Sequence, residues 1–119
     1  MNKNIMKKWV KALRSGKYRK TTGDLCKVAQ NGNKSYCCLG VLTDLYNKEN
    51  KRCPVETVGE KDLSHWVMDW SGMHSSFGSL KYGYSDKTIT SLSELNDCNK
   101  AKRSFKRMAD IIEKNWEQL

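Results

Sequence analysis

The stretch Tyr36-Cys37-Cys38-Leu39-Gly40-Val41-Leu42 decides the fold of this chain, because it is the longest uncharged apolar run in a sequence of which 29% is charged. From residue 38 onward, apolar residues recur at spacings of three and four, which predicts a helix to about residue 47 with one buried face. That face consists of Leu39, Leu42, Leu45 and Tyr46. Thr43, Asp44 and Asn47 are expected to point outward. We expect this helix to lie at the centre of the core.

A β-hairpin is predicted before this helix. Asn31-Gly32-Asn33 is typical of a tight turn, because a type I′ turn needs positive φ at both central residues. The turn joins predicted strands over residues 25–29 and 34–37, and the second strand continues into the central helix. Gly40 has no Cβ, which lets another backbone approach the helix closely.

Three further helices follow from apolar periodicity and capping residues. An amphipathic helix is predicted over about residues 4–15 and ends at Gly16. A shorter one, capped by Asp62 or Ser64, carries Trp66 and Trp70. The last runs over about residues 100–118, and its 105–116 part is expected to pack on the central helix.

Weaker signals complete the predicted fold. They indicate a capping box that starts at residue 91 and a helical turn ending at residue 95. A short strand is predicted at 55–58, and residues 74–87 read as a loop with a weak strand. We therefore predict an α+β fold, with residues 1–119 as a single small domain of three main helices packed on a short antiparallel hairpin.

Length and cysteine content exclude several classes. No apolar run reaches 18 residues and the N-terminus lacks an apolar signal core, so neither a membrane span nor a secretory signal is predicted, and we expect a cytosolic protein. The five cysteines include no Cys-x-x-Cys pair and lack secretory context, which favours free buried thiols over disulfides or zinc.

The net charge of +9 is concentrated in the first third of the chain. Residues 1–36 hold ten Lys or Arg against one acid, whereas residues 37–119 hold twelve of each sign. This asymmetry indicates an anionic partner, which could be nucleic acid, a nucleotide-like ligand or an acidic protein surface. The alternative is a solvated face without a partner. The predicted basic face consists of Lys3, Lys7, Lys11 and Arg14.

Two further groups of residues suit an anionic ligand. Tyr18 lies among Lys17, Arg19 and Lys20, where it could stack on a base or simply cover the edge of the core. The predicted last helix begins with several cations, and unpaired amides at a helix start bind anions, unless Asp97 neutralises them. Tryptophans and tyrosines beside a glycine-rich loop could form aromatic walls. The predicted ligand-binding set is Trp66, Trp70, Tyr82, Tyr84, Asn96, Asp97, Arg103 and Arg107.

Catalysis is a weaker interpretation. Cys37 or Cys38, followed by His65 and Asn96, has the residue order of papain-like hydrolases, but the flanking residues and the compressed spacing do not match. Paired acids on one helix face are absent from the sequence pattern, so metal-dependent hydrolysis lacks its usual ligands. We predict no catalytic residue, no metal and no cofactor.

Several motifs resemble a family of small, uncharacterised proteins of tailed bacteriophages. They are Trp9-x-x-Ala12-Leu13-x-Ser15-Gly16-x-Tyr18, Cys37-Cys38-Leu39-Gly40-Val41-Leu42, Trp70-Ser71-Gly72, Leu95-Asn96-Asp97, and Ser104-Phe105 with Ala109-Asp110-x-Ile112-Glu113. The resemblance covers almost the whole chain and implies a phage-encoded protein in the host bacterial cytoplasm, without known catalytic residues. Small phage proteins of this kind are often counter-defence factors, and some capture nucleotide signals of host immunity.

We therefore expect a counter-defence protein that sequesters an anionic nucleotide-derived ligand. Binding of nucleic acid or of an acidic host protein is the alternative. A homo-oligomer remains open, and no membrane partner is predicted.

Overall fold

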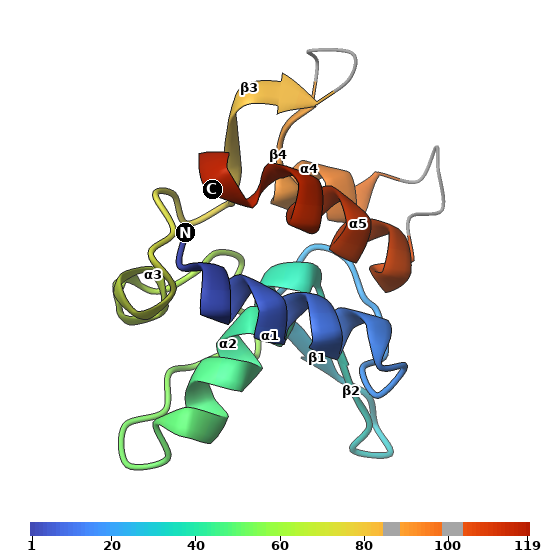
Figure 1. Cartoon of the computed structure of the whole chain (residues 1–119). Helices are drawn as coiled ribbons and strands as arrows, with labels where there is room; N and C mark the ends of the chain where they lie inside the picture. The colour runs from blue at the N-terminus through green and yellow to red at the C-terminus, as the bar shows by residue number, and fades with distance from the viewer. Residues whose placement is uncertain (85–88, 99–103) are drawn as a thin grey trace.

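The computed structural model describes the backbone of residues 1–84, 89–98 and 104–119, and the side chains of these residues except 81–84 and 89. The chain forms an α+β domain (Figure 1). Its elements are α1 (Lys3–Arg14), β1 (Cys26–Val28), β2 (Lys34–Tyr36), α2 (Cys38–Glu49), α3 (His65–Ser71), β3 (Ser79–Tyr84), β4 (Ile89–Ser91), α4 (Leu92–Asp97), α5 (Phe105–Asn115) and the 3-10 turn η2 (Trp116–Gln118). The predicted fold class is thus confirmed.

Polar caps fix where the helices begin. The Asn2 side chain accepts from two amides of α1, and Ser64, Ser91 and Ser104 each accept from an amide in the first turn of α3, α4 and α5. The thiol of Cys37 takes the same position at α2, where it accepts from the Gly40 amide at 3.3 Å.

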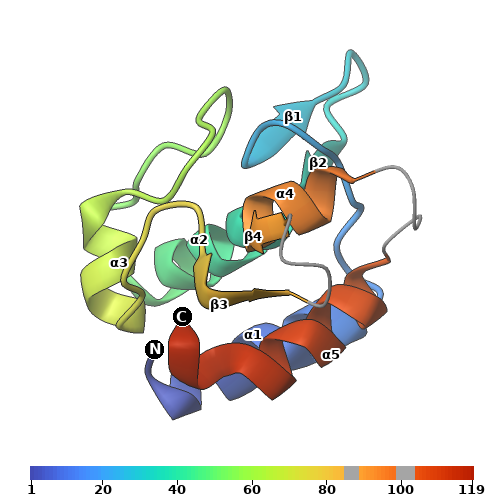
Figure 2. The same ribbon diagram turned by 90° about the horizontal axis from the view of Figure 1, so that it is seen from above.

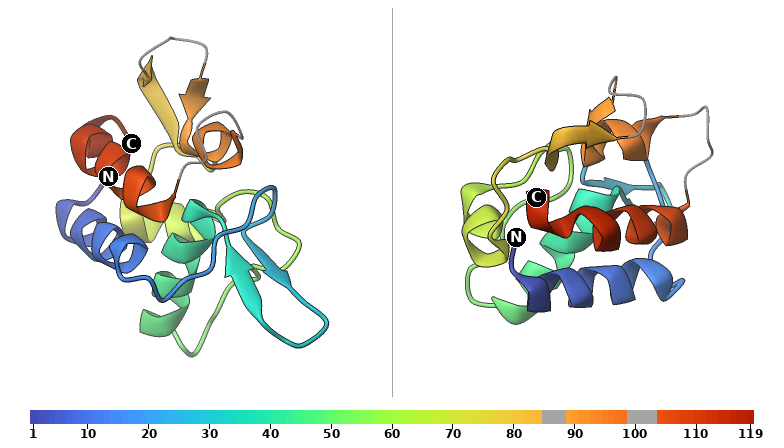
Figure 3. Two further views of the ribbon diagram at one scale, coloured as in Figure 1. Left: turned by 90° about the vertical axis from the view of Figure 1, so that its right-hand side faces the viewer. Right: turned by 45° about the horizontal axis from the view of Figure 1, so that its top comes forward.

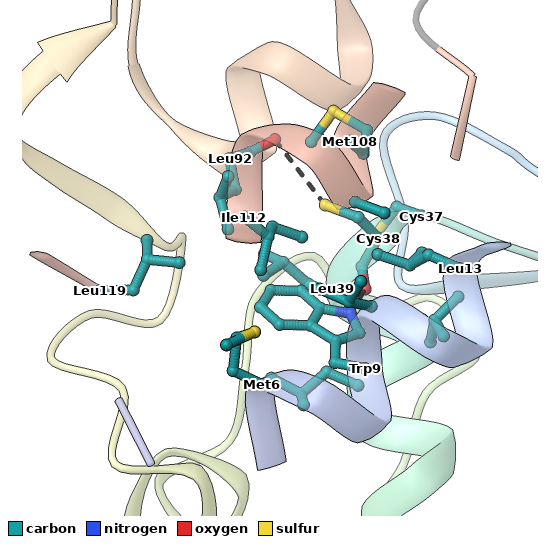
Figure 4. Close-up of a cluster of buried hydrophobic side chains, with 14 of the residues drawn as sticks. Met6, Trp9, Leu13, Cys37, Cys38, Leu39, Leu92, Met108, Ile112 and Leu119 are labelled. Carbon is teal, nitrogen blue, oxygen red and sulfur yellow. Dashed lines mark hydrogen bonds between the residues drawn. The ribbon is translucent and has the colours of Figure 1, made fainter. Parts of the chain in front are cut away.

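The core lies between α1, α2, α4 and α5. Trp9 is fully buried at its centre, and its indole N–H donates to the Cys38 carbonyl at 2.8 Å. Figure 4 shows Ile112 of α5 close to this ring, Cys38 and Leu92 above it, and Met108 of α5 above these two. The indole bond satisfies the only polar atom that Trp9 brings into the core.

Helix α5 lies along α1, and the two run side by side in Figures 1 and 2. We predicted that it packs on α2, but its main partner is α1, and the main helix contacts of α2 are with α1, α4 and α3. The reason is that α1 and α5 both carry long apolar stripes, which bury each other, and Arg14 of α1 is paired with Asp110 and Glu113 of α5. The chain ends also meet, since the N-terminal amine donates to the Leu119 carbonyl at 3.3 Å.

The predicted hairpin is confirmed and packs closely on α2. Strands β1 and β2 pair in antiparallel register, with Cys26 opposite Tyr36. A Cβ added to Gly40 would lie 1.8 Å from the carbonyl oxygen of Leu25. The missing side chain is therefore what allows the start of the hairpin to contact α2, as predicted. Figure 3 shows that hairpin well apart from the β3–β4 pair.

Several local predictions were wrong. Thr43 is fully buried rather than outward, because its hydroxyl donates to the Leu39 carbonyl at 3.0 Å and so brings no unpaired polar group into the core. Helix α5 begins at Phe105, after the Ser104 cap, and not near residue 100. Helix α4 continues through Asn96 to Asp97.

The strand predictions were also incomplete. Residues 55–58 form no strand, and only Val58 makes a single bridge to Cys26. Strand β4, which pairs with β3, was not predicted at all.

Candidate anion-binding groove between α1 and α2

A groove of about 310 Å³ opens between α1 and α2 near Tyr18. Its lining residues are Lys8, Lys11, Ala12, Ser15, Lys17, Tyr18, Leu45 and Lys48. We call it the Tyr18 groove. Ala12, Tyr18 and Leu45 are half-buried and form an apolar floor on the core, whereas the four lysines supply positive charge. None of these lining residues is a carboxylate.

The turn after α1 places Tyr18 in the groove. Helix α1 ends at Arg14 with Ser15 as its C-cap, and Gly16 follows with φ of +76°, a conformation that glycine adopts without strain. The chain then returns toward α2, where the Tyr18 ring packs edge-on against Tyr36 with ring centres 5.2 Å apart. The Tyr18 hydroxyl donates to Asp44 of α2. Burial, and then this hydrogen bond, raise the pKa of Tyr18 above its usual value.

Lys48 closes one side of the groove over the tyrosine. Its Nζ lies 3.1 Å from the Tyr18 oxygen, 3.1 Å from a carboxylate oxygen of Asp44, and 5.2 Å from the centre of the Tyr18 ring. Hydrogen bonds to Tyr18 and Asp44 raise the pKa of Lys48, so it stays charged. The aromatic ring and a cation are thus held together at the groove wall.

The remaining lysines differ in their partners. Lys8 is paired with Glu49 at 2.7 Å, and the same carboxylate accepts from the Trp70 indole at 3.1 Å. The hydrogen bond from Lys8 lowers the pKa of Glu49. Lys11 and Lys17 are exposed and make no ion pair with the described residues. The groove therefore has two cations available to an anionic ligand without breaking an existing pair.

The predicted basic face on α1 is only partly open. Lys3, Lys7 and Lys11 are exposed and, within the described part of the chain, have no ion-pair partner. Arg14 is bound by Glu113 at 3.1 Å and by Asp110 at 2.7 Å, and these hydrogen bonds raise its pKa. These two acids are three residues apart on one face of α5, so the prediction that no helix face carries paired acids was wrong, although Arg14 already binds both. Three lysines, one of them in the Tyr18 groove, therefore carry the available charge of this face.

The predicted aromatic wall is divided between two environments. Trp70 packs on Tyr46 and donates to Glu49, so its indole is held against α2. Trp66 is 57% exposed and stacks with His65. It borders a hollow of about 370 Å³ whose lining includes Glu56, Glu60 and Asp62. Three carboxylates make that hollow a poor site for an anion.

Other members of the predicted ligand-binding set hold the fold or lie elsewhere. Asn96 is only 1% exposed; its oxygen accepts from the Cys38 amide, and its amide donates to Thr21 and Asp97. Asp97 also accepts from the Gly23 amide at 3.1 Å. Arg107 is exposed on α5. The structure does not gather these residues around one hollow.

Some predicted residues lie outside the described part of the chain. The side chains of Tyr82 and Tyr84 and all of Arg103 belong to this group, as do Lys100 and Lys102. Because α5 begins at Phe105, its described first turn carries Lys106 and Arg107 only, fewer cations than the sequence pattern indicated.

The cysteines at the start of α2 are built into the core. Burial raises the pKa of Cys37 to about 11 and raises the pKa of Cys38 well above its usual value. The Cys38 thiol donates to the Leu92 carbonyl at 3.8 Å. A nucleophilic cysteine needs a lowered pKa, so this environment favours the structural interpretation of both thiols. His65 contacts Trp66 on exposed α3.

Metal clusters and membrane-spanning helices are both absent from the described residues. Within residues 1–84, 89–98 and 104–119, no group of three His, Cys, Asp or Glu side chains is placed to hold a metal ion. None of the helices in these ranges combines the length and apolar character needed to cross a bilayer.

Tyr18 and Lys11 were predicted to face an anion, in separate groups, whereas Lys8, Lys48 and Leu45 were not predicted to border a binding site. Lys17 was noted only as a neighbour of Tyr18. Leu45 was predicted on the buried face of the central helix, whereas Lys48 was placed in the polar loop after residue 47, although α2 continues to Glu49. That prediction gave no signal that the two residues border a common hollow.

The chain belongs to a family described as a domain of unknown function, DUF8296, whose model matches residues 1–116. That match includes every helix and strand described above, with only the end of η2 outside it. No curated protein and no solved structure matches the chain significantly. Function must therefore be argued from the groove itself.

Proposed function

We propose that this protein is a small phage-encoded binding protein that sequesters an anionic, nucleotide-like ligand in the Tyr18 groove, and that it acts against host defence in the bacterial cytoplasm. The observation that carries the proposal is the lining of the groove, which combines four lysines with an aromatic floor and no carboxylate. The phage origin and the counter-defence role rest on the resemblance of the sequence motifs.

A nucleotide presents the chemistry that this groove complements. Its base has an aromatic face, and stacking of a base on a protein aromatic ring contributes about 1–3 kcal/mol. Its phosphate carries negative charge, which Lys11 and Lys17 can meet because neither is engaged in an ion pair with described residues. The volume of about 310 Å³ lies at the lower end of ligand sites, which suits a small ligand.

The test is calorimetric titration with nucleoside monophosphates and triphosphates. The Lys11→Glu/Lys17→Glu variant is expected to weaken binding at least about tenfold, as the loss of charge-assisted contacts predicts. Lys27→Glu/Lys34→Glu is the matched control, since it makes the same charge change on the exposed hairpin. Equal loss in both variants, or no loss in the first, would contradict a specific site in the groove.

Nucleic-acid binding is the second candidate, and the exposed stripe of Lys3, Lys7 and Lys11 favours it. Duplex binding should weaken steeply with salt, with a log–log slope near −0.9 for each neutralised phosphate. Charge reversal at Lys3 and Lys7, which lie outside the Tyr18 groove, should then abolish binding. The small-ligand proposal expects a shallow slope and little effect of these two reversals. An acidic host protein would also lose affinity on their reversal, without binding DNA.

A further inference from the structure

We infer that the Tyr18 groove is one half of a longer track, and that its ligand is a short single-stranded oligonucleotide rather than a mononucleotide. The second half is a hollow of about 530 Å³ at the C-terminal end of α2. Its lining residues are Lys48, Glu49, Asn50, Lys51, Arg52 and Cys53, and we call it the Arg52 hollow. This inference rests on the proposed function and specifies the length of the ligand.

Two contacts join the halves. Lys48 lines both the Tyr18 groove and the Arg52 hollow. Lys8 lines the first and Glu49 the second, and their side chains are 2.7 Å apart. The two hollows are therefore adjacent, and a ligand long enough to pass Lys48 and the Lys8–Glu49 pair would reach from the Tyr18 ring into the Arg52 hollow. Figure 1 shows the backbone of this region at the C-terminal end of α2.

The charge of the Arg52 hollow suits a second phosphate. Lys51 and Arg52 are exposed and, within the described part of the chain, have no ion-pair partner. Glu49 is the one acidic residue of the lining, and Lys8 and Trp70 already donate to it. The track thus presents Lys11 and Lys17 beside the Tyr18 ring in the Tyr18 groove, and Lys51 and Arg52 in the Arg52 hollow.

The backbone of the Arg52 hollow is held in place before any ligand binds. The Asn47 side chain donates to the Val55 carbonyl and accepts from the Val55 amide. These two hydrogen bonds hold the backbone of Val55, and with it the end of the loop, against α2. The Cys53 amide also donates to the Asn50 carbonyl at 3.1 Å. A loop fixed in this way loses little entropy when it binds, which favours affinity.

A structural explanation of the same cations predicts a different result. Basic residues near the C-terminal end of a helix interact favourably with its dipole, so Lys51 and Arg52 could stabilise α2 alone. Their replacement would then lower the thermal midpoint without changing the affinity for any ligand. A mononucleotide would also leave them unused, because it fills only the Tyr18 groove.

The experiment compares adenosine monophosphate with a single-stranded trinucleotide of adenosines, by calorimetry on the full chain. We expect the trinucleotide to bind at least about tenfold more tightly. Lys51→Glu/Arg52→Glu should remove about tenfold of the trinucleotide affinity and leave monophosphate binding within about twofold. Lys27→Glu/Lys34→Glu should change neither, and circular dichroism confirms folding of each variant. If the reversal variant does not fold, Lys51→Gln/Arg52→Gln takes its place.

The outcomes separate this inference from the proposed function. Equal affinities for the two probes, with no effect of the Lys51 and Arg52 substitutions, would overturn the track and leave the Tyr18 groove intact. Equal losses in the Arg52 hollow and hairpin variants would show nonspecific attraction and also overturn it. If neither probe binds, both the track and the proposed nucleotide site are wrong.

Discussion

Replacing Gly40 by alanine tests the contact around which the fold is built. The added Cβ would lie 1.8 Å from the Leu25 carbonyl oxygen and 2.7 Å from its carbon, so helix and hairpin must separate by more than 1 Å. Backbone atoms cannot escape by changing rotamer, so we place the overpacking cost near its usual upper value of about 3 kcal/mol. Separation also weakens the bond from the Cys37 amide to that carbonyl, worth about 1 kcal/mol, which offsets the helix-propensity gain of about 1 kcal/mol.

We therefore expect Gly40→Ala to lower the free energy of unfolding by about 3 kcal/mol and the thermal midpoint by about 10 °C. Urea denaturation followed by circular dichroism measures the free energy of unfolding, and thermal denaturation followed in the same way measures the midpoint. Gly32→Ala is the comparison, because Gly32 has φ of +85° and nothing within 4 Å of an added Cβ, so it reports backbone strain alone, about 1–2 kcal/mol. If Gly40→Ala is as stable as the parent, or more stable by the helix-propensity gain of about 1 kcal/mol, the Leu25 carbonyl does not lie against α2.

Three further predictions address the core, the thiols and the groove. Thr43→Val should change the free energy of unfolding by less than about 1 kcal/mol, because valine keeps the buried shape and removes the hydroxyl donor. Thr43→Lys should unfold the chain, because it buries a charge. A Thr43→Lys variant that remains folded in urea denaturation would show that residue 43 points outward, as the sequence predicted. At pH 8 a maleimide should label the exposed Cys53 first, whereas Cys37, which is buried and has a pKa raised to about 11, should react only after denaturant is added. Mass spectrometry resolves the order of labelling, and early labelling of Cys37 would contradict its burial. Glu49→Gln should raise the affinity for a nucleotide severalfold, because it releases Lys8 from its ion pair. Calorimetric titration measures this change, and an unchanged affinity would show that Lys8 does not contact the ligand.

Much of the fold could be predicted because its signals are local. The turn at Gly32, the apolar spacing after Cys38 and the serine caps each act within a few residues, and the hairpin and helices follow from them. Thr43 was misplaced because residue type suggested a polar face, whereas its hydroxyl is satisfied within the same helix. The start of α5 was misplaced because apolar periodicity does not distinguish a helix from the segment before its cap.

The packing partner of α5 could not be predicted in this way. Both α1 and α2 offered an apolar face, and periodicity does not say which faces meet. The choice depends on contacts between residues almost a hundred positions apart, such as Arg14 with Asp110 and Glu113.

The groove was harder to predict than the fold, because it is assembled from three segments. Tyr18 meets Asp44 across 26 positions and Lys8 meets Glu49 across 41, and no sequence spacing encodes either contact. Sequence spacing likewise could not show which residues surround the predicted aromatic wall. Trp66 is exposed as an aromatic wall should be, but acids brought in by residues 56–62 make its surroundings negative.

The available positive charge of this protein is not the charge that its composition shows. Residues 1–36 hold the entire excess, yet acids from the rest of the chain neutralise part of it, since Glu49 pairs with Lys8, and Asp110 and Glu113 pair with Arg14. What remains unpaired among the described residues includes Lys11 and Lys17, which line the Tyr18 groove, and Lys51 and Arg52, which come from the balanced part of the sequence and line the Arg52 hollow. Exposed ion pairs such as Lys8 with Glu49 contribute only about 0–1 kcal/mol, so a multivalent anion can displace the carboxylate at little cost. This distribution of unpaired charge supports our proposal that an anionic ligand binds in the track between α1 and the end of α2 rather than on the outer stripe of α1.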